Sequence, residues 1–253
     1  MISYIKRKII KYKNGSSIEI EDAIAVEKKL VVSVKGKNIL SIYCTPMMIK
    51  ELVTGLLLTE GIITEKISPD VINIDYGDKI TVNLLFDSNN VPERLATSRC
   101  LGGFTVLKKR EFDMINDDFS LTIKALKKLF DDFQQKSALF RMTGGFHSAA
   151  ISDGNTILSF SEDIGRHNAV DKVIGDALLK DIPYTMKVML VSCRISSEII
   201  SKSSRWSIPI LASRSAPTDL AVEIAKMSGV TLVGFIRGDS MNIYTNPQRI
   251  IPK

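Results

Sequence analysis

The sequence predicts an α/β fold in which a smaller, strand-rich N-terminal region precedes a larger region built on a mostly parallel sheet. Residues 187–236 alternate between apolar strand segments and helical segments, as parallel strands joined by crossover helices do. Residues 30–86 contain short β-type runs separated by turn residues. The chain has 253 residues, of which 45% are apolar and 25% charged, so it can bury a core. We expect the two regions to span residues 1–110 and 111–253.

Two hairpins and one helix are expected in the N-terminal region. The hairpins lie at 30–44 and 71–86, where apolar runs flank a KGKN turn and a GDK turn. A helix is expected over 47–58, because apolar residues recur every three or four positions between a proline and a glycine. Residues 87–103 show neither the apolar periodicity of a helix nor that of a strand, so we expect a loop there. This loop carries Cys100.

The C-terminal region is expected to start with a helix and a hairpin. An amphipathic helix is predicted over 120–140 with Ser120 as its N-cap, and a hairpin over 147–161. A further helix is predicted over 165–179, with Glu162 and Asp163 near its start, where a carboxylate can cap free N–H groups. Further strands are expected at 187–193, 208–213 and 231–236. They alternate with helices expected at 195–206 and 216–229.

Composition and charge exclude several classes of protein. The three cysteines, Cys44, Cys100 and Cys193, are an odd number at wide spacing, which is typical of reduced thiols in the cytoplasm. The N-terminus has no signal-peptide pattern, and the longest apolar stretch, 52–63, is too short to span a membrane. A net charge of +6 spread along the chain gives little support for nucleic acid as a partner. The Cys-x-x-Cys and His-x-Glu pairs of zinc sites are absent, so we expect no zinc.

Three arginines follow the predicted parallel strands. Arg194, Arg214 and Arg237 each come directly after a strand segment. The carboxyl ends of parallel strands gather at one edge of a sheet, where free N–H groups at helix starts favour anions. Any one of these arginines could be a solvated loop charge. Three arginines at equivalent positions after parallel strands, however, predict a site that binds phosphate or pyrophosphate. Ser213 and Ser215 add hydroxyl donors beside Arg214.

The two histidines give a second indication of a site. His147 and His167 each lie in a segment rich in glycine and polar residues. A single buried histidine is more often structural, whereas two beside glycine turns favour a site lining. Arg166, Asn168 and Lys172 crowd the same predicted first turns as His167, which suggests hydrogen bonding to a heterocycle or a sugar.

Cys100 is the candidate nucleophile. A thiol with a pKa of about 8.5 is only about 3% thiolate at pH 7, and Arg94 and Arg99 could raise that fraction. An incidental loop cysteine remains the alternative. Cys44 and Cys193 end apolar strands and are expected to be packing residues, since free cysteine behaves as a small hydrophobe.

Taken together, the motifs resemble the FdhD/NarQ family of formate dehydrogenase accessory sulfurtransferases. The resemblance runs from the early strands to Ile250. The motifs that carry it, in order, are LLLTEGII, SRC with LGG, TGGFHSAA, EDIGRHNAVDKVIG, LVSCR, ILASRSAPT, LVGFIRG and MNIYTNPQRI.

The resemblance implies a cytoplasmic, homodimeric sulfur carrier. Such a protein accepts sulfur from a cysteine desulfurase as a persulfide. It then passes the sulfur to molybdenum in the bis-(molybdopterin guanine dinucleotide) cofactor, which is its bound substrate, before the cofactor enters formate dehydrogenase. The implied fold is similar to the α/β/α fold of cytidine deaminases, and GDP would mimic one end of the cofactor.

Carried onto this chain, the resemblance assigns the persulfide to Cys100, while Gly103 stands where the family has a second cysteine. A non-catalytic chaperone for the cofactor is therefore an alternative, and a hydrolytic deaminase, which would need a metal, is a third. The implied contacts to the cofactor are Gly144, Gly145, His147, Glu162, Asp163, Arg166, His167, Asn168, Lys172, Arg194, Ser213, Arg214, Ser215, Arg237, Asn242 and Tyr244.

Overall fold

The computed structural model describes residues 2–63, 66–85 and 114–252. The helices are α1 Ile49–Thr59, α2 Ile123–Lys136, α3 Ala138–Thr143, α4 Arg166–Leu179, α5 Ser197–Arg205 and α6 Asp219–Ser228, with short 3-10 turns at Pro69–Val71 and Pro247–Arg249. The strands are β1 Tyr4–Lys13, β2 Ser16–Ala25, β3 Lys28–Val34, β4 Lys37–Cys44, β5 Ile72–Tyr76, β6 Ile80–Leu84, β7 Leu121–Thr122, β8 His147–Ser152, β9 Ile157–Asp163, β10 Val188–Val191, β11 Ile210–Ser213, β12 Thr231–Arg237, β13 Ser240–Ile243 and β14 Ile250–Ile251.

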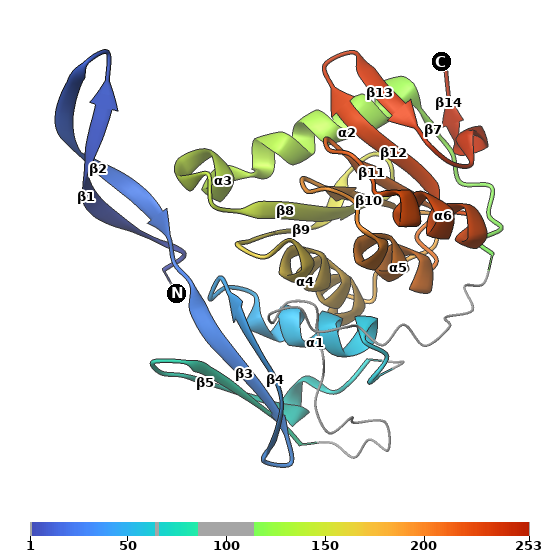
Figure 1. Ribbon diagram of the computed structural model, residues 1–253. Helices are drawn as coiled ribbons and strands as arrows, with labels where there is room; N and C mark the ends of the chain where they lie inside the picture. The colour runs from blue at the N-terminus through green and yellow to red at the C-terminus, as the bar shows by residue number, and fades with distance from the viewer. Residues whose placement is uncertain (1, 64–65, 86–113, 253) are drawn as a thin grey trace.

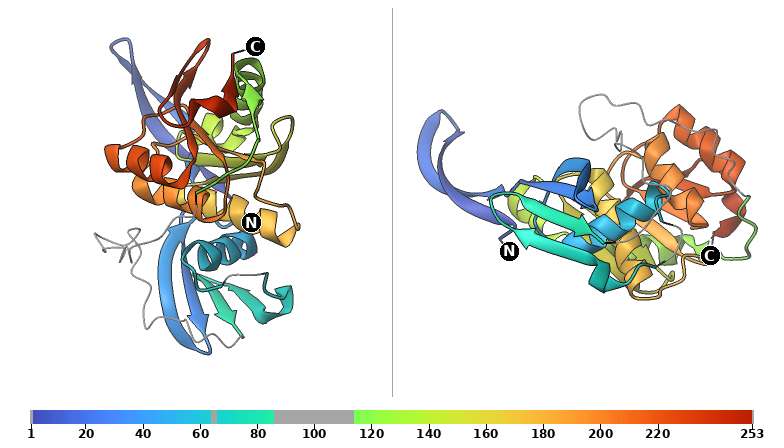
Figure 2. Two further views of the ribbon diagram at one scale, coloured as in Figure 1. Left: turned by 90° about the vertical axis from the view of Figure 1, so that its right-hand side faces the viewer. Right: turned by 90° about the horizontal axis from the view of Figure 1, so that it is seen from below.

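The N-terminal region contains both predicted hairpins and the predicted helix. β3 pairs with β4 and β5 with β6, and a parallel pairing of β3 with β6 joins them into one sheet of order β4-β3-β6-β5. A further hairpin, β1–β2, was not predicted. It projects from the rest of the molecule in Figure 1 and in the right-hand view of Figure 2.

The C-terminal region is built on a sheet of order β13-β12-β11-β10-β8-β9. Only β10–β11 and β11–β12 are parallel, whereas β10–β8, β8–β9 and β12–β13 are antiparallel. The sheet is therefore mixed, and the expectation of a mostly parallel sheet is not confirmed. The reason is that the β8–β9 hairpin is added beside β10, while β13 folds back antiparallel beside β12.

Helices cover both faces of this sheet (Figure 1). Alternate strand residues point to opposite faces. In β10, Val188 and Leu190 join a core with Phe130 and Phe133 of α2, while Met189 joins the core formed with α4 and α5. The second core continues without a break through α1 to the N-terminal sheet. The two regions thus share one hydrophobic interior.

Two glycines allow α1 and α4 to cross closely. A Cβ atom on Gly55 would lie 1.8 Å from the carbonyl oxygen of Asp171, and one on Gly175 would lie 2.0 Å from that of Glu51. No side chain fits at either position without moving a helix. This contact fixes the N-terminal sheet against the C-terminal region.

The helix predicted over 120–140 is two helices. Thr122, not Ser120, is the N-cap of α2, and its Oγ1 accepts a hydrogen bond from the Ala125 N–H at 3.0 Å. Helix α2 ends at Lys136, and Ser137, with φ −72° and ψ 65°, starts α3 in a new direction. None of the helices within the described residues is long and apolar enough to cross a bilayer.

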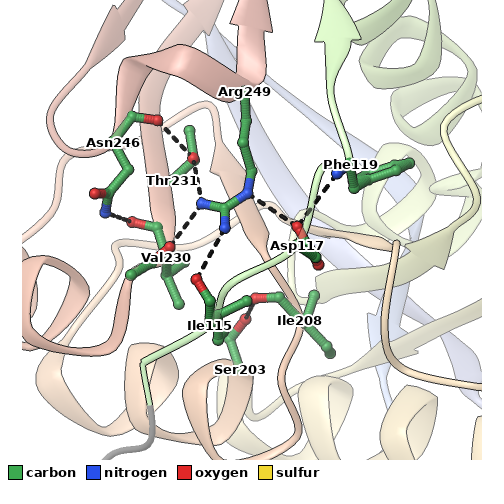
Figure 3. Close-up of polar contacts among 10 residues, drawn as sticks. Ile115, Asp117, Phe119, Ser203, Ile208, Val230, Thr231, Asn246 and Arg249 are labelled. Carbon is green, nitrogen blue, oxygen red and sulfur yellow. Dashed lines mark hydrogen bonds and ion pairs between the residues drawn. The ribbon is translucent and has the colours of Figure 1, made fainter.

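Arg249 ties residues 114–119 to the C-terminal end of the chain. Its guanidinium is buried and donates hydrogen bonds to the Asp117 carboxylate at 3.1 Å and to the carbonyl oxygens of Ile115 at 3.1 Å and Gly229 at 2.7 Å (Figure 3). A buried guanidinium is tolerated only when its donors are paired in this way. The sequence patterns gave no indication of this role.

Candidate functional site

A pocket of about 390 Å³ lies at the edge of the large sheet where β10 and β11 end. Its lining combines aromatic rings with polar side chains. The aromatic residues are Phe133, Phe140 and Phe146. The polar residues are Gln134, Ser137, Arg141, His147, Ser148, Ser192 and Arg214. A mainly apolar cavity with a few convergent polar groups is the usual composition of a small-molecule site.

Strand register creates this pocket from distant segments. β8 runs antiparallel to β10, so the beginning of β8 lies beside the end of β10. There the Ser148 N–H donates to Ser192 Oγ at 2.9 Å, and the Ser192 N–H donates to the Ser148 carbonyl oxygen at 3.0 Å. β11 lies parallel to β10 and ends at the same edge. His147 and Arg214, both predicted site residues, therefore line one pocket.

The three predicted arginines lie along this edge. Arg194 and Arg214 follow β10 and β11, Arg237 ends β12, and all three side chains are exposed. The Arg237 Nε–H donates to the Arg214 carbonyl oxygen at 3.3 Å, and its guanidinium lies 5.4 Å from the ring centre of Phe235. The predicted placement is confirmed, and positive charge at strand ends favours an anion.

Ser213 shapes the turn that carries Arg214. Its buried hydroxyl donates to the Cys193 carbonyl oxygen at 2.7 Å and accepts from the Ser215 N–H at 3.0 Å. The Ser213 hydroxyl is thus committed to the protein. Of the two predicted serine donors, only Ser215 is partly exposed.

Three of the predicted contacts are buried and bind each other. The Lys172 ammonium lies 2.6 Å from the Asp163 carboxylate, and both side chains have no exposed surface. The Asn168 amide donates to Asp163 at 2.9 Å and to the Tyr43 carbonyl oxygen at 2.9 Å. Asp163 also accepts from the Thr45 N–H at 3.1 Å. These groups hold α4 against the end of β4 and the residues that follow it, and their buried positions keep them out of the candidate site.

Glu162 caps a different helix from the one predicted. Its carboxylate lies at the end of β9 and accepts hydrogen bonds from the N–H groups of Leu139 at 3.0 Å and Phe140 at 2.8 Å, in the first turn of α3. Helix α4 has Gly165 at its N-cap with no side-chain cap. Glu162 therefore positions α3, which supplies Phe140 and Arg141 to the pocket.

The two histidines have different surroundings. His147 is half-buried in the pocket, where burial, and next the charge of Arg166, lower its pKa, although Asp163 acts in the opposite sense. His167 is buried in the first turn of α4, and its Nε2 lies 3.0 Å from the carboxylate of Glu198 in the first turn of α5. Only His147 lines the pocket.

The remaining predicted contacts lie beside the pocket or away from it. Gly144 is the left-handed C-cap of α3, and a Cβ on Gly145 would come within 3.2 Å of Ala25. Asn242 lies on β13, and its amide donates to the Tyr244 hydroxyl at 3.4 Å. Arg166 is the exposed first residue of α4. None of these five lines the pocket within the described part of the chain.

Comparison with known proteins decides the family. The sequence model of the FdhD/NarQ family matches residues 25–251. The chain belongs to the FdhD/NarQ family. Two relatives are both named sulfur carrier protein FdhD. The one from Staphylococcus haemolyticus is 36% identical, with 96% of this chain and 95% of the relative covered, and the one from Geobacillus kaustophilus is 35% identical, with 97% of each covered.

A solved structure supports the same family. It is described as that of a formate dehydrogenase accessory protein from Desulfotalea psychrophila. The two proteins are 27% identical in sequence and superpose with a TM-score of 0.81. The superposition covers 99% of this chain and 100% of the solved chain. The FdhD/NarQ fold is thus shown, while the likeness to cytidine deaminases stays a prediction.

Within this family member, the two described cysteines are poor nucleophiles. Burial raises the pKa of Cys44 to about 12 and that of Cys193 to about 11. Both side chains are buried, as the sequence predicted for packing residues. Cys100 and the loop 87–103 lie outside the described residues, so the prediction for them stays a prediction.

Sequence patterns missed most of the pocket of this FdhD/NarQ protein, because only His147 and Arg214 of its ten lining residues were predicted site residues. Phe133 and Gln134 were assigned to an ordinary amphipathic helix, and Arg141 follows that helix without any motif of its own. Arg141 lies two residues before the TGG turn that starts at Thr143, and that closeness is the one local signal that could have pointed to it. Its guanidinium also donates to the Gln134 carbonyl oxygen at 2.8 Å, which closes the end of α2.

Proposed function

We propose that this chain is a sulfur carrier that receives sulfur on Cys100 from a cysteine desulfurase and passes it to a molybdenum cofactor. The cofactor is bis-(molybdopterin guanine dinucleotide), held as a substrate, and formate dehydrogenase is the protein that receives it. The observation that carries the proposal is the arginine-rimmed pocket at the sheet edge, in a chain whose relatives are named sulfur carriers. The proposed setting is the cytoplasm, and no zinc is required.

The pocket suits a nucleotide end of this cofactor. Phenylalanine rings can pack against a planar base, and the Gln134 amide offers both a donor and an acceptor to its edge. Arg141 and Arg214 face the same space, and guanidinium groups bind phosphates through paired hydrogen bonds. Arg194 and Arg237 extend the positive charge along the edge. GDP should therefore act as a mimic.

Sulfur transfer itself needs one reactive thiol. The Cys100 thiolate would attack the outer sulfur of the desulfurase persulfide and release the desulfurase thiolate. If that outer sulfur passed to the metal, the S–S bond would break with its electron pair staying on Cys100 as the thiolate, and the two electrons that turn the transferred sulfane sulfur into a sulfido ligand would come from the metal of the substrate in its reduced state. The raised pKa values of Cys44 and Cys193 support Cys100 as the carrier, because a thiol that stays protonated attacks poorly.

Mass spectrometry tests the carrier step. Incubation with a cysteine desulfurase and cysteine should add the mass of one sulfur atom to the protein. The adduct should be lost in Cys100→Ala and kept in Cys44→Ala and Cys193→Ala. A Cys100→Ala protein that still gains the sulfur would refute this function.

Calorimetric titration with GDP tests the pocket. Arg214→Ala should weaken binding about ten- to a hundred-fold, the effect of one lost hydrogen bond to a charged group. Lys226→Ala is a matched control, because it removes an exposed charge from the last turn of α6, away from the pocket. Equal GDP affinity in the two variants would show that Arg214 is only a surface charge.

A non-catalytic cofactor chaperone is the second candidate, favoured by Gly103 at the position of the family's second loop cysteine. The two functions differ in a complementation assay. A chaperone would restore formate dehydrogenase activity with Cys100→Ala but not with Arg214→Ala, whereas a carrier would fail with both.

A further inference from the structure

A polar pair lies on the opposite side of the large sheet from the pocket. His167 is in the first turn of α4 and Glu198 is in the first turn of α5, and the His167 Nε2 atom lies 3.0 Å from the Glu198 carboxylate. The His167 side chain is 8% exposed, whereas that of Glu198 is 26% exposed. The carboxylate is thus held from the buried side while part of it reaches the surface.

Ser196, two residues before Glu198, carries a hydroxyl that the described chain does not satisfy. Ser196 is the N-cap of α5, where a serine usually accepts a hydrogen bond from the first turn, but its side chain makes no such bond. Its Oγ atom is buried and has no hydrogen-bond partner among the described residues. Buried polar atoms in folded proteins nearly always have a partner. A ligand beside Glu198 would supply the one that is missing.

The chain crosses the edge of the sheet between the pocket and this pair. Ser192 lines the pocket, together with residues of α2 and α3, whereas Ile195 packs in the core formed with α4 and α5. Figure 1 shows α2 and α3 on one side of the sheet and α4 and α5 on the other. Four residues of extended chain span at most about 14 Å, so Ser192 and Ser196 lie within that distance of each other. One elongated ligand can therefore reach both places.

Positive charge lies on the path between the two places. Arg166 and Arg194 are both exposed at this edge. The charge of Arg166 acts on His147 in the pocket, and His167 is the next residue of the chain. Arg194 lies two residues before Ser196. Because guanidinium groups bind phosphates through paired hydrogen bonds, a ligand with phosphates in its middle fits this path.

The donors and acceptors of the pair define which ring system it fits. A carboxylate offers two acceptor oxygens, and a serine hydroxyl can donate. A 2-amino-4-oxopyrimidine edge has the complementary order, with an amino group and a ring N–H as donors and then a carbonyl oxygen as acceptor. Each half of the proposed substrate carries this edge twice, once in its guanine and once in its pterin. The pocket suits one of them, and the site at Glu198 suits the other.

We propose that Glu198, together with Ser196, binds the pterin ring of the cofactor, across the sheet edge from the pocket that takes its guanine. The phosphates between the two rings then lie over Arg166 and Arg194. His167 is a positioning residue, because it holds the Glu198 carboxylate in place without contacting the ring. The identity of the ligand rests on the proposed function.

Fluorescence titration of the full chain with pterin and with lumazine tests the site. Lumazine has a carbonyl in place of the 2-amino group, so it presents an acceptor where the carboxylate needs a donor. With GDP saturating the pocket, the protein should bind pterin and prefer it to lumazine by about tenfold or more. Glu198→Gln replaces one acceptor with an amide donor, so the preference should reverse. Glu223→Gln, on the exposed face of α6, is the matched control and should keep the preference for pterin.

A second variant tests the hydroxyl without changing the charged pair. Ser196→Ala should weaken pterin binding by about two- to tenfold, the effect of one lost hydrogen bond, and should leave GDP affinity unchanged. Equal pterin affinity in Ser196→Ala and wild type would contradict the role of this hydroxyl.

The reversal of preference separates recognition from a structural role. If the pair only joined α4 to α5, Glu198→Gln would change stability and leave the ratio of the two affinities as it is in Glu223→Gln. That result, an absence of pterin binding, or displacement of pterin by GDP would each overturn the proposal. The sulfur adduct on Cys100 is measured separately. Pterin binding without the adduct would refute the sulfur-carrier function and leave this site in place, whereas the adduct without pterin binding would do the reverse.

Discussion

Removing the Glu162 carboxylate should loosen α3 and weaken ligand binding without unfolding the protein. Helix α3 contains six residues, none of them buried, and its N-cap Ser137 makes no side-chain cap hydrogen bond. The two bonds from Leu139 and Phe140 to Glu162 are therefore its principal anchor at that end. Because water can reach Phe140, we take about 2 kcal/mol for the loss of both, within the range for bonds to a charged acceptor.

Losing the free energy that these two hydrogen bonds contribute to the order of α3 should lower the affinity for GDP. If α3 must be ordered before GDP binds, a cost of about 2 kcal/mol lowers the competent fraction, and with it the affinity, by up to about 30-fold. Glu162→Gln keeps one acceptor and should lie between wild type and Glu162→Ala. The global melting temperature should change little. Calorimetric GDP titration measures the affinity, and Glu223→Gln on the exposed face of α6 is the control.

Amide hydrogen exchange provides a readout that does not depend on GDP. The Leu139 and Phe140 amides should lose protection in Glu162→Ala and keep it in Glu223→Gln. Unchanged protection at both amides would refute the role of Glu162 in holding α3. Lost protection with unchanged GDP affinity would instead show that α3 is not a wall of the binding site.

Three further outcomes are expected. Gly175→Ala should destabilise the protein by about 2 kcal/mol, because overpacking against a backbone oxygen costs about 1 to 3 kcal/mol and outweighs the helix propensity of alanine. Gly77→Ala, whose added Cβ would make only ordinary contact at 3.7 Å, should be nearly neutral in the same urea titration. Burial lowers the pKa of His147, so the unfolded chain takes up a proton near pH 6.5 before the folded chain does, and stability should fall as the pH drops through that window. His147→Gln should flatten that part of the pH dependence of the melting temperature, and an unchanged slope would contradict it. Iodoacetamide at pH 7.5 should leave Cys44 and Cys193 unmodified in the native protein and modify both in urea, as peptide mass spectrometry would show; rapid native labelling of either would contradict their raised pKa values.

Local sequence patterns determined most of the elements and the general position of the site. Apolar periodicity gave both N-terminal hairpins, α1, α4 and the alternation from β10 to β12, because each depends on residues close in sequence. It also placed Arg194, Arg214 and Arg237 at strand ends, and strand ends of one direction meet at one edge. The family motifs LLLTEGII, EDIGRHNAVDKVIG, LVSCR, ILASRSAPT and LVGFIRG lie largely in these same segments.

The tertiary structure alone decided which polar groups are free to meet a ligand. Asp163 and Lys172 look like site residues in the sequence, but the chain after β4 covers them and each neutralises the other. Glu162 caps a helix more than twenty residues before it in the chain, and the aromatic walls of the pocket come from α2 and α3. Burial of a charge depends on partners from distant segments, and periodicity within one segment carries no information about them.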